Sequence, residues 1–143
     1  MPDKKCWLEI MGHDAYAELI GLEVVHAEPG RAEVRLTITP KVLNGHGNVH
    51  GGAIFTLADY AGALASNMLG DPTIATNGSI AFLRPAGSGI LTAKARTVKS
   101  GRRMKYLVVD ICNDRDELIA VFHGGAITVH RKNPAPPLPE VEF

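Results

Sequence analysis

The sequence predicts an α+β fold, in which an antiparallel sheet of about five or six strands wraps its apolar face around one long central helix. Three observations indicate this fold. Residues 53–69 form one apolar run that is too long for a typical strand and is rich in the helix formers Ala and Leu. Two extended runs precede this segment and four follow it, with turn residues between them. A chain of 143 residues, 45% of them hydrophobic, is long enough for one domain with a substantial core.

The first elements are a short helix and two strands. Residues 13–20 are expected to form a helix that ends at Gly21, because glycine commonly follows the last helical residue. Strands are expected at residues 22–27 and 31–39, joined by the turn Glu28-Pro29-Gly30. In the second strand apolar and polar residues alternate, which is typical of an antiparallel strand with one buried face.

A glycine-rich loop and the long helix occupy the middle of the chain. Pro40 ends the second strand, the loop covers residues 43–52, and the helix is expected at residues 53–69. Because this helix is apolar on nearly every side, we expect it to be buried.

The second half of the chain is expected to contain four strands and a tail. Turn residues at 84–87, 100–102 and 113–116 separate the strands. The strands are expected at residues 73–83, 89–99, 104–112 and 118–130. Residues 131–143 contain four prolines and are expected to form a tail, which leaves a single domain at residues 1–130.

Composition and charge exclude several classes of protein. Lys and Arg number 15, as do Asp and Glu, so the chain lacks the basic excess of a nucleic-acid-binding protein. The two cysteines, Cys6 and Cys112, give no disulfide framework. The first residues lack the apolar run of a signal peptide, and Asp59 within the apolar stretch 51–70 disfavours a membrane span. We therefore expect a soluble, cytoplasmic protein with neither a nucleic-acid nor a membrane partner.

Asp59 is the only charged side chain between Gly51 and Gly70. An unpaired carboxylate in a buried helix is costly, so it must be paired, hydrated or used in chemistry. One interpretation is a structural Asp paired with a buried Arg or a backbone amide. Since an Asp in the middle of a helix cannot cap that helix, we favour the other interpretation, a functional carboxylate.

The glycine-rich loop provides a second candidate part of a site. Gly47, Gly51 and Gly52 permit unusual backbone angles and the close approach of a ligand, although they also suit a tight strand-to-helix connection. Free N–H groups of Gly51 or Gly52 at the helix start would bind an anion or a developing oxyanion. Gly51 and Asp59 lie about 12 Å apart along a helix, whereas groups acting on one bond must lie within about 3–3.5 Å. If both act on one bond, they come from two chains with antiparallel helices, so the sequence predicts a catalytic dimer.

Two further motifs point to weaker alternatives. Residues 45–50 nearly match a dinucleotide-binding fingerprint, but no βαβ pattern surrounds them. His46 and His50 have the spacing of metal ligands on a helix, but the flanking glycines disfavour a helix there and a third ligand is not evident. We therefore expect no metal, and we interpret His50 as a hydrogen-bonding residue at the helix entrance.

Three arginines lie at the expected turns. Arg84, Arg102 and Arg103 would most simply form a solvated edge. Because Arg forms bidentate pairs with phosphates, they would grip a phosphorylated ligand if the site lies nearby. The sequence contains no Gly-x-Ser-x-Gly elbow, which disfavours a serine hydrolase.

One motif carries a resemblance to a known family. Residues 44–52 (Asn-Gly-His-Gly-Asn-Val-His-Gly-Gly) and Asp59 resemble the pattern Asn…Gly…His-Gly-Gly…Asp of the hotdog-fold acyl-CoA thioesterases, specifically the phenylacetate-degradation (PaaI-like) group. Residues 80–85 and 100–103 are also similar to that family, and the resemblance covers roughly residues 13–130. It implies the hotdog fold, a long helix wrapped by an antiparallel sheet, and homodimers that pair into homotetramers with active sites between subunits.

The resemblance also implies a role for each matching residue. Asp59 would be the general base or the nucleophile, and the backbone N–H of Gly51 would be the oxyanion donor. Asn44 and His50 would orient the attacking water or the thioester and support the loop. The three arginines named above would bind the nucleotide and pyrophosphate of coenzyme A. Coenzyme A would enter as part of the substrate, so no separate cofactor is implied.

The resulting hypothesis is hydrolysis of an acyl-CoA thioester, with an aryl or medium-chain acyl group, to the free acid and coenzyme A. Phe55, Tyr60 and Leu64 are expected to line the acyl pocket. Some relatives use a Ser or Thr of the next strand, where this chain has Ala75, with Thr76 and Ser79 nearby. The alternatives are a hotdog-fold hydratase or dehydratase, which needs an acid/base pair, and a non-catalytic acyl-CoA binding or sensing module, which needs no buried carboxylate.

Overall fold

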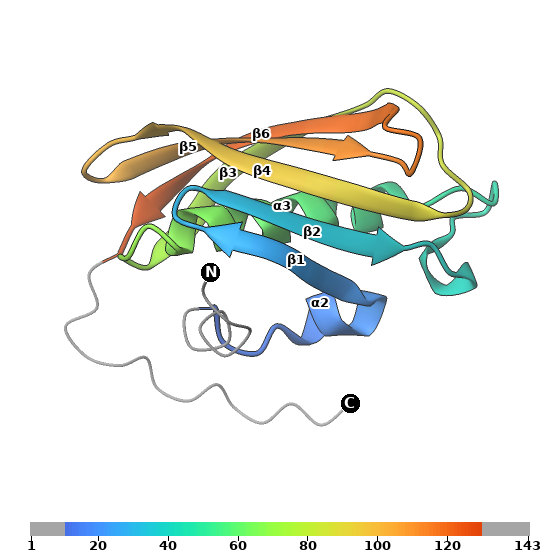
Figure 1. Cartoon of the computed structure of the whole chain (residues 1–143), viewed down its shortest axis with the longest axis horizontal. Coiled ribbons are helices and arrows are strands. Elements are labelled where there is room, and N and C mark those ends of the chain that lie inside the picture. The colour runs from blue at the N-terminus through green and yellow to red at the C-terminus, as the bar shows by residue number, and fades with distance from the viewer. Residues whose placement is uncertain (1–10, 130–143) are drawn as a thin grey trace.

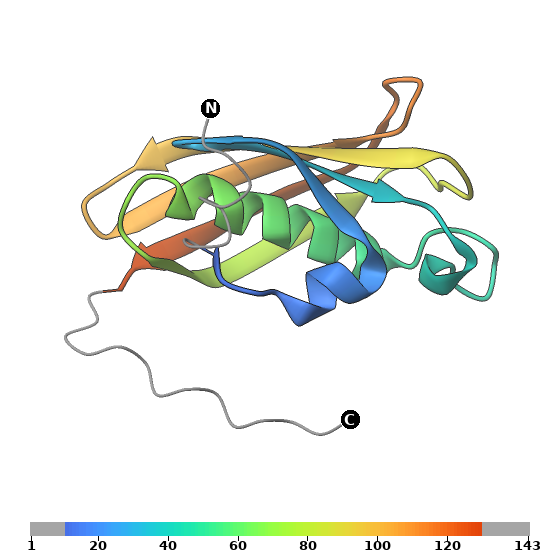
Figure 2. The same ribbon diagram turned by 60° about the horizontal axis from the view of Figure 1, so that its bottom comes forward.

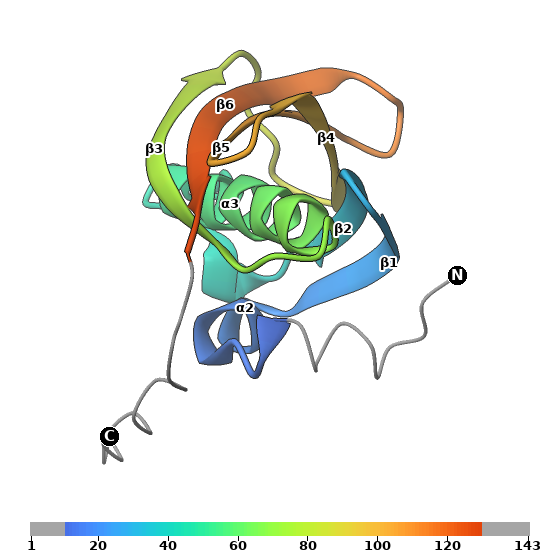
Figure 3. The same cartoon turned by 90° about the vertical axis from the view of Figure 1, so that its left-hand side faces the viewer.

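The computed structural model describes residues 11–129, in which a six-stranded antiparallel sheet curves around the long helix α3 (Figure 1, Figure 3). The strand order across the sheet is β1-β2-β4-β5-β6-β3, and every neighbouring pair is antiparallel. This arrangement confirms the predicted α+β architecture. The strands are β1 (Leu22–Glu28), β2 (Arg31–Thr37), β3 (Thr73–Phe82), β4 (Ile90–Ser100), β5 (Met104–Cys112) and β6 (Leu118–Thr128), and the helices are α2 (Ala15–Ile20), η1 (Pro40–Val42) and α3 (Gly51–Asn67).

The predicted elements are present, with bounds within two residues of those expected. The predicted tail at residues 131–143 and the ends of the predicted domain at residues 1–130 lie outside the described residues. Within residues 11–129, none of the helices has the length and apolar character needed to cross a bilayer.

Helix α3 begins two residues earlier than predicted, at Gly51. His50 is its N-cap, because the ring Nδ1 accepts a hydrogen bond from the Gly52 N–H at 2.8 Å. The backbone carbonyl of His50 accepts the N–H groups of Ala53 and Ile54 at 2.9 and 3.2 Å. Helix propensity predicts a start at Ala53, because glycine is a poor helix former and two glycines come before it. Histidine is also not among the preferred capping residues, so His50 gave no signal of the true start.

Helix α3 buries one side against the sheet and leaves the other side uncovered. Leu57 and Leu64 of α3 are fully buried in one core with Val34 of β2. The sheet does not cover the opposite side, along which α2 lies (Figure 2, Figure 3). The expected burial of α3 therefore holds only for the side that faces the sheet, and both Phe55 and Asp59 are exposed in the single chain.

The two edge strands of the sheet differ in character. Strand β1 carries the charged residue Glu23 and a register shift between Val24 and His26, features that discourage pairing with another chain. Strand β3 contains neither a charged residue nor a proline, and it exposes 50% of Ile74 and 54% of Phe82. It therefore presents an open strand edge about 33 Å long. A register shift between Ala75 and Asn77 interrupts this edge, but no charged residue or proline protects it against pairing.

Candidate active site

Asn44 organises the glycine-rich loop that precedes α3. Its side-chain Oδ1 accepts hydrogen bonds from the backbone N–H groups of His46 at 2.9 Å and Asn48 at 3.2 Å. Its own N–H donates to the Asn48 carbonyl at 2.7 Å. Gly47 has a φ of +78°, a left-handed conformation that favours glycine and allows the loop to turn back. The contacts of Asn44 thus hold the loop, which is one of the two roles expected of this residue.

His50 connects the loop to the helix. Because its Nδ1 accepts the Gly52 N–H, the hydrogen bond uses the tautomer that carries the ring proton on Nε2. A Cβ atom on Gly52 would lie 3.0 Å from this nitrogen, so a larger residue at that position would crowd the cap. The described residues contain no group of three or more His, Cys, Asp or Glu side chains that could hold a metal ion.

Gly51 provides an unengaged N–H at the start of α3. His50 accepts the amides of Gly52, Ala53 and Ile54, whereas no acceptor among residues 11–129 takes the N–H of Gly51. The positive end of the helix dipole coincides with this donor. Between Gly51 and Gly52, which the sequence did not separate, Gly51 is therefore the amide able to hold a developing oxyanion.

The end of β3 and the segment that follows it lie against the start of α3. A Cβ atom on Gly51 would lie 3.2 Å from Cζ of Phe82, so this ring packs directly on the glycine. Four residues further on, the carbonyl of Ala86 accepts the N–H of Val49 at 2.8 Å. Residues 82–86 thus form one wall of the helix entrance.

Asp59 lies eight residues beyond Gly51 and lines a pocket between α3, β3 and β6. Its side chain is exposed in the single chain, and its carboxylate makes no hydrogen bond or ion pair with residues 11–129. The interpretation of Asp59 as a structural residue paired with a buried Arg or amide therefore fails. Partial burial, with a smaller contribution from the Asp14 carboxylate, raises the pKa of Asp59. An unpaired carboxylate with a raised pKa beside a pocket is able to act as a base or a nucleophile.

A single chain does not bring Gly51 and Asp59 together. Both lie on the continuous helix Gly51–Asn67, so they are about 12 Å apart along its axis. Groups that act on the same bond must lie within about 3–3.5 Å of each other. The two residues can therefore serve one bond only if a second copy of the chain contributes one of them.

The hydroxyl groups of Thr76 and Ser79 do not line this pocket. The register between β3 and β6 shifts from Ala75 to Asn77, which makes Thr76 an extra residue in β3. Its hydroxyl donates to Asn77 Oδ1 at 2.9 Å. Ser79 lies opposite the exposed His123, and of the three positions considered only Ala75 lines the pocket.

The pocket wall differs from the predicted one. The predicted lining residues Phe55, Tyr60 and Leu64 are absent from it. Leu64 is fully buried, because its helix face turns toward the sheet. Phe55 reaches the pocket indirectly, since its ring meets the lining residue Phe122 edge to face, with 5.4 Å between the ring centroids and an interplanar angle of 85°.

Most lining residues are small and were missed by the sequence analysis. Gly62 and Ala63 lie three and four residues after Asp59, and this helical spacing, which places them on the same face, could have identified them. Two hydroxyl residues, Ser66 and Thr73, lie further along the same wall. Glycine and alanine residues of β6 complete the floor.

Arg84 is held by an acidic residue at the end of the sheet near Gly51. It forms an ion pair with Glu117, whose carboxylate also contacts Arg115 Nε at 3.0 Å. The hydrogen bond from Asn113, together with these two arginines, lowers the pKa of Glu117 and keeps it charged. Arg84 is therefore fixed near the helix entrance, with part of its guanidinium committed to Glu117.

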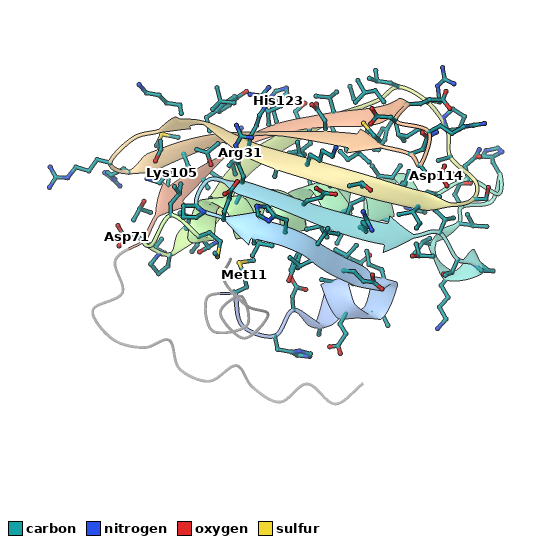
Figure 4. All side chains as sticks on the ribbon, viewed as in Figure 1. Met11, Arg31, Asp71, Lys105, Asp114 and His123 are labelled. Atoms are coloured by element: carbon teal, nitrogen blue, oxygen red, sulfur yellow. The ribbon has the colours of Figure 1, made fainter. Side chains whose placement is uncertain are left out.

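The three arginines do not converge within one chain. Arg102 and Arg103 lie in the turn between β4 and β5, at the end of the sheet opposite to Arg84. The Arg84 N–H donates to the Ile119 carbonyl of β6, and the Arg103 carbonyl accepts the Thr128 N–H of the same strand, so nine residues or about 30 Å separate the two levels. Figure 4 shows the two ends, with Lys105 beside the β4–β5 turn and Asp114 in the β5–β6 turn. One chain therefore cannot direct all three arginines at one pyrophosphate.

Comparisons of the sequence with known proteins find hydrolases of thioesters. A family model described as "Thioesterase superfamily" matches residues 46–120. The acyl-coenzyme A thioesterase PaaI of Escherichia coli (strain K12) is 37% identical over 113 residues, which cover 78% of this chain and 81% of that protein. The 1,4-dihydroxy-2-naphthoyl-CoA hydrolase of Listeria monocytogenes (serotype 1/2a, strain 10403S) is 28% identical over 107 residues, which cover 73% and 87%.

Solved structures show the same fold. The E. coli PaaI protein of the phenylacetic acid degradation operon superposes with a TM-score of 0.82 at 33% identity, covering 85% of this chain and 89% of that chain. A mutant of the phenylacetic acid degradation protein PaaI of Thermus thermophilus gives a TM-score of 0.78 at 36% identity, covering 81% and 100%.

Proposed function

The chain belongs to the thioesterase superfamily and is a hotdog-fold thioester hydrolase, and we propose that it hydrolyses coenzyme A thioesters of aryl or medium-chain acids. The observation that carries the proposal is a pair of unengaged groups on α3, the N–H of Gly51 and the carboxylate of Asp59. The names of the relatives support the substrate class, since one is an acyl-coenzyme A thioesterase and another a CoA hydrolase.

The proposed chemistry uses one group from each of two subunits. The Gly51 N–H of one subunit holds the thioester carbonyl oxygen and stabilises the negative charge that develops on it. Asp59 of the other subunit takes a proton from water, the resulting hydroxide adds to the carbonyl carbon, and the C–S bond breaks. The thiolate of coenzyme A then takes the proton from Asp59. Direct attack by Asp59 would instead form an anhydride that water cleaves.

The edge strand β3 supports the shared site. It is long, uncharged and exposed, and pairing it with β3 of a second copy would continue the sheet and cover the pocket beside Asp59. An antiparallel pairing also sets the two α3 helices in opposite directions, which moves the partner's Gly51 toward Asp59. We therefore propose a homodimer as the catalytic unit.

Binding of the nucleotide part of coenzyme A involves the arginines in this proposal. Arg84 lies near the helix entrance, whereas Arg102 and Arg103 lie about 30 Å away along β6. They would meet one coenzyme A only if they come from different subunits. The two subunits of a dimer already meet this condition, so the further association of dimers into a homotetramer stays a prediction. The cytoplasmic location stays a prediction.

The test uses purified protein with benzoyl-, phenylacetyl-, hexanoyl- and palmitoyl-CoA, with thiol release followed by a disulfide dye. Asp59→Asn is measured beside the wild type, and Asp110→Asn is the control, because Asp110 lies on β5 away from the pocket lining. We expect release by the wild type and the control and its loss in Asp59→Asn, with coenzyme A binding retained.

Two outcomes would contradict the proposal. Equal activity of wild type and Asp59→Asn would remove Asp59 from the chemistry. Binding of the esters without any thiol release would leave the chain as an acyl-CoA binding protein. Mixing Asp59→Asn with a variant inactive at Gly51 tests the shared site, since a mixed dimer regains one complete site only if the two groups come from different subunits.

A further inference from the structure

The pocket beside Asp59 is small and has polar groups at both ends. It offers about 30 Å³ to a molecule of the size of water. A water molecule needs about 10–15 Å³ of such space, so the pocket has room for about two waters and is too small for an acyl group. Of the α3 residues that line the pocket, Asp59 comes first and Ser66 last, so these two residues mark its ends.

The end away from Asp59 consists of two hydroxyl groups. Ser66 is fully buried on α3, and its Oγ lies 2.7 Å from Oγ1 of Thr73 at the start of β3. Ser66 Oγ donates to the Ala63 carbonyl at 3.1 Å. Because this bond uses the Ser66 proton, the Thr73 hydroxyl is the donor between the pair. A hydroxyl oxygen has two lone pairs, so Thr73 Oγ1 is able to accept a hydrogen bond from water.

A third hydroxyl lies beside this pair. Thr128 of β6 is directly opposite Thr73 in the β3–β6 register and is 7% exposed. Its Oγ1 is buried and makes no hydrogen bond within residues 11–129. Buried hydroxyls are normally hydrogen-bonded, either to protein groups or to ordered water. This end of the pocket therefore has hydrogen-bonding capacity that the described residues leave unused.

The distance between the two ends suits a short row of water molecules. Ser66 follows Asp59 by seven residues, which is about 10.5 Å along the helix axis. Two waters between a carboxylate and a hydroxyl make three hydrogen bonds of about 2.8 Å, which together span about 8 Å. The pocket wall also contains the backbone carbonyl of Asn77, since a Cβ atom on Gly124 would lie 2.5 Å from it. Waters in this pocket thus have the several polar partners that a buried water requires.

We propose that the pocket is a water site that supplies the nucleophile of the reaction, and that Ser66 and Thr73 are positioning residues for this water. The proposal rests on the proposed function, because it takes Asp59 as the base. The acyl group then lies outside the pocket. The water next to Asp59 gives a proton to the carboxylate, its oxygen adds to the thioester carbonyl carbon, and the second water takes its place. The size of the pocket therefore selects water as the acyl acceptor over larger alcohols.

The test measures which acceptor the acyl group reaches when ethanol is added to the assay. Ethanol in place of water gives the ethyl ester and coenzyme A, and mass spectrometry separates this ester from the free acid. With the best-cleaved of the four CoA esters, we expect the wild type to form ethyl ester well below the molar ratio of ethanol to water. Thr73→Ala removes a methyl and a hydroxyl group from the pocket end, so it should raise the fraction of ethyl ester.

Thr73→Val removes the hydroxyl at constant size. It should lower kcat about two- to tenfold with KM unchanged, the range that one net hydrogen bond gives, and Thr73→Ser should restore kcat. Ser79→Ala is the matched control, because its hydroxyl lies on the same strand but outside the pocket lining. Thermal unfolding of each variant separates a changed reaction from a damaged fold.

Three results would overturn the proposal while thiol release upholds the proposed function. The wild type could form ethyl ester in proportion to the ethanol present, which would mean that the nucleophile comes from the surrounding solvent. The other two are an ester fraction that Thr73→Ala does not raise and a kcat that Thr73→Val does not lower. Failure of the wild type to cleave any of the four esters would instead overturn the proposed function and this proposal with it.

Discussion

Replacing Gly51 by proline removes the proposed oxyanion donor and little else. A proline at the first helical position is well tolerated, since its missing N–H has no partner within the helix and its fixed φ suits the helix start. Gly51 is that position in α3, and its N–H makes no hydrogen bond with residues 11–129. The preceding residue, His50, has a ψ of 133°, which is in the extended range that a following proline favours.

The structure also gives the size of the expected effect. Gly51 supplies the one unengaged amide that we assign to the oxyanion, so Gly51→Pro should lose the contribution of a whole donor. Such a donor is worth about 2.7–4 kcal/mol, or roughly 10²–10³ in kcat. The free energy of unfolding should change by less than about 1 kcal/mol, because no internal hydrogen bond is lost and proline restricts the unfolded chain.

Gly51→Ala is the matched variant for this experiment. It adds the same Cβ atom, which would lie 3.2 Å from Cζ of Phe82, but it keeps the N–H. Phe82 is 54% exposed, so its ring is able to yield by the few tenths of an ångström required. The assay is steady-state thiol release from hexanoyl-CoA, with urea unfolding of both variants. The reasoning is refuted if Gly51→Pro and Gly51→Ala have equal activity, whether both stay active or both lose activity.

Two further predictions concern the stability of α3. Burial raises the pKa of Asp59, so the native state binds the proton of this carboxyl group more tightly than the unfolded state does. As pH rises and Asp59 ionises, the free energy of unfolding therefore falls. Asp59→Asn should therefore unfold at a higher temperature than the wild type at neutral pH, and the difference should shrink toward pH 3.8; calorimetry that shows a constant difference would contradict this. His50→Ala should lose the cap on Gly52 and about 1 kcal/mol of stability in urea, whereas His50→Asn should retain most of it. Equal losses would show that the ring acceptor does not stabilise the helix start.

The pattern of elements was predictable because its signals are local. Alternation in residues 31–39 and the turn residues between later strands depend on near neighbours in the chain, and these strands appear within two residues of their expected bounds. The exposure of Asp59 was not predictable in the same way. The apolar composition of α3 does not tell which of its sides the sheet covers, and the side beside β3 stays open.

The separation of the arginines follows from the order of the elements along the chain. One strand, β4, connects the turn after Arg84 to the turn that holds Arg102 and Arg103. Turns joined by a single strand lie at opposite ends of a sheet, and a strand of eleven residues spans about 36 Å. The pairing of Arg84 with Glu117 is different, because it depends on the order of strands across the sheet, which the chain order does not give.

A shared site places a condition on the twofold axis of the dimer. For Asp59 to meet the partner's Gly51, two antiparallel copies of α3 must be related by an axis level with Phe55, midway between the two residues. Each of them then lies four residues, or about 6 Å, from the axis along the helix. Phe55 is beside Gly78 of β3, since a Cβ atom on Gly78 would lie 3.3 Å from Cζ of Phe55. The chemistry therefore requires an axis near Gly78.

The edge strand leads independently to the same axis. The centre of Thr73–Phe82 lies between Asn77 and Gly78, so antiparallel pairing over the full length of β3 places the axis there. In this pairing, Phe82 lies opposite the first two residues of the partner's β3. The ring of Phe82 packs on Gly51, and the start of β3 lines the pocket with Asp59. The axis that the chemistry needs and the axis that buries the whole strand edge thus agree to within one residue, although they rest on different contacts. A dimer that forms simply by covering the β3 edge would for this reason also bring the two halves of the proposed site together.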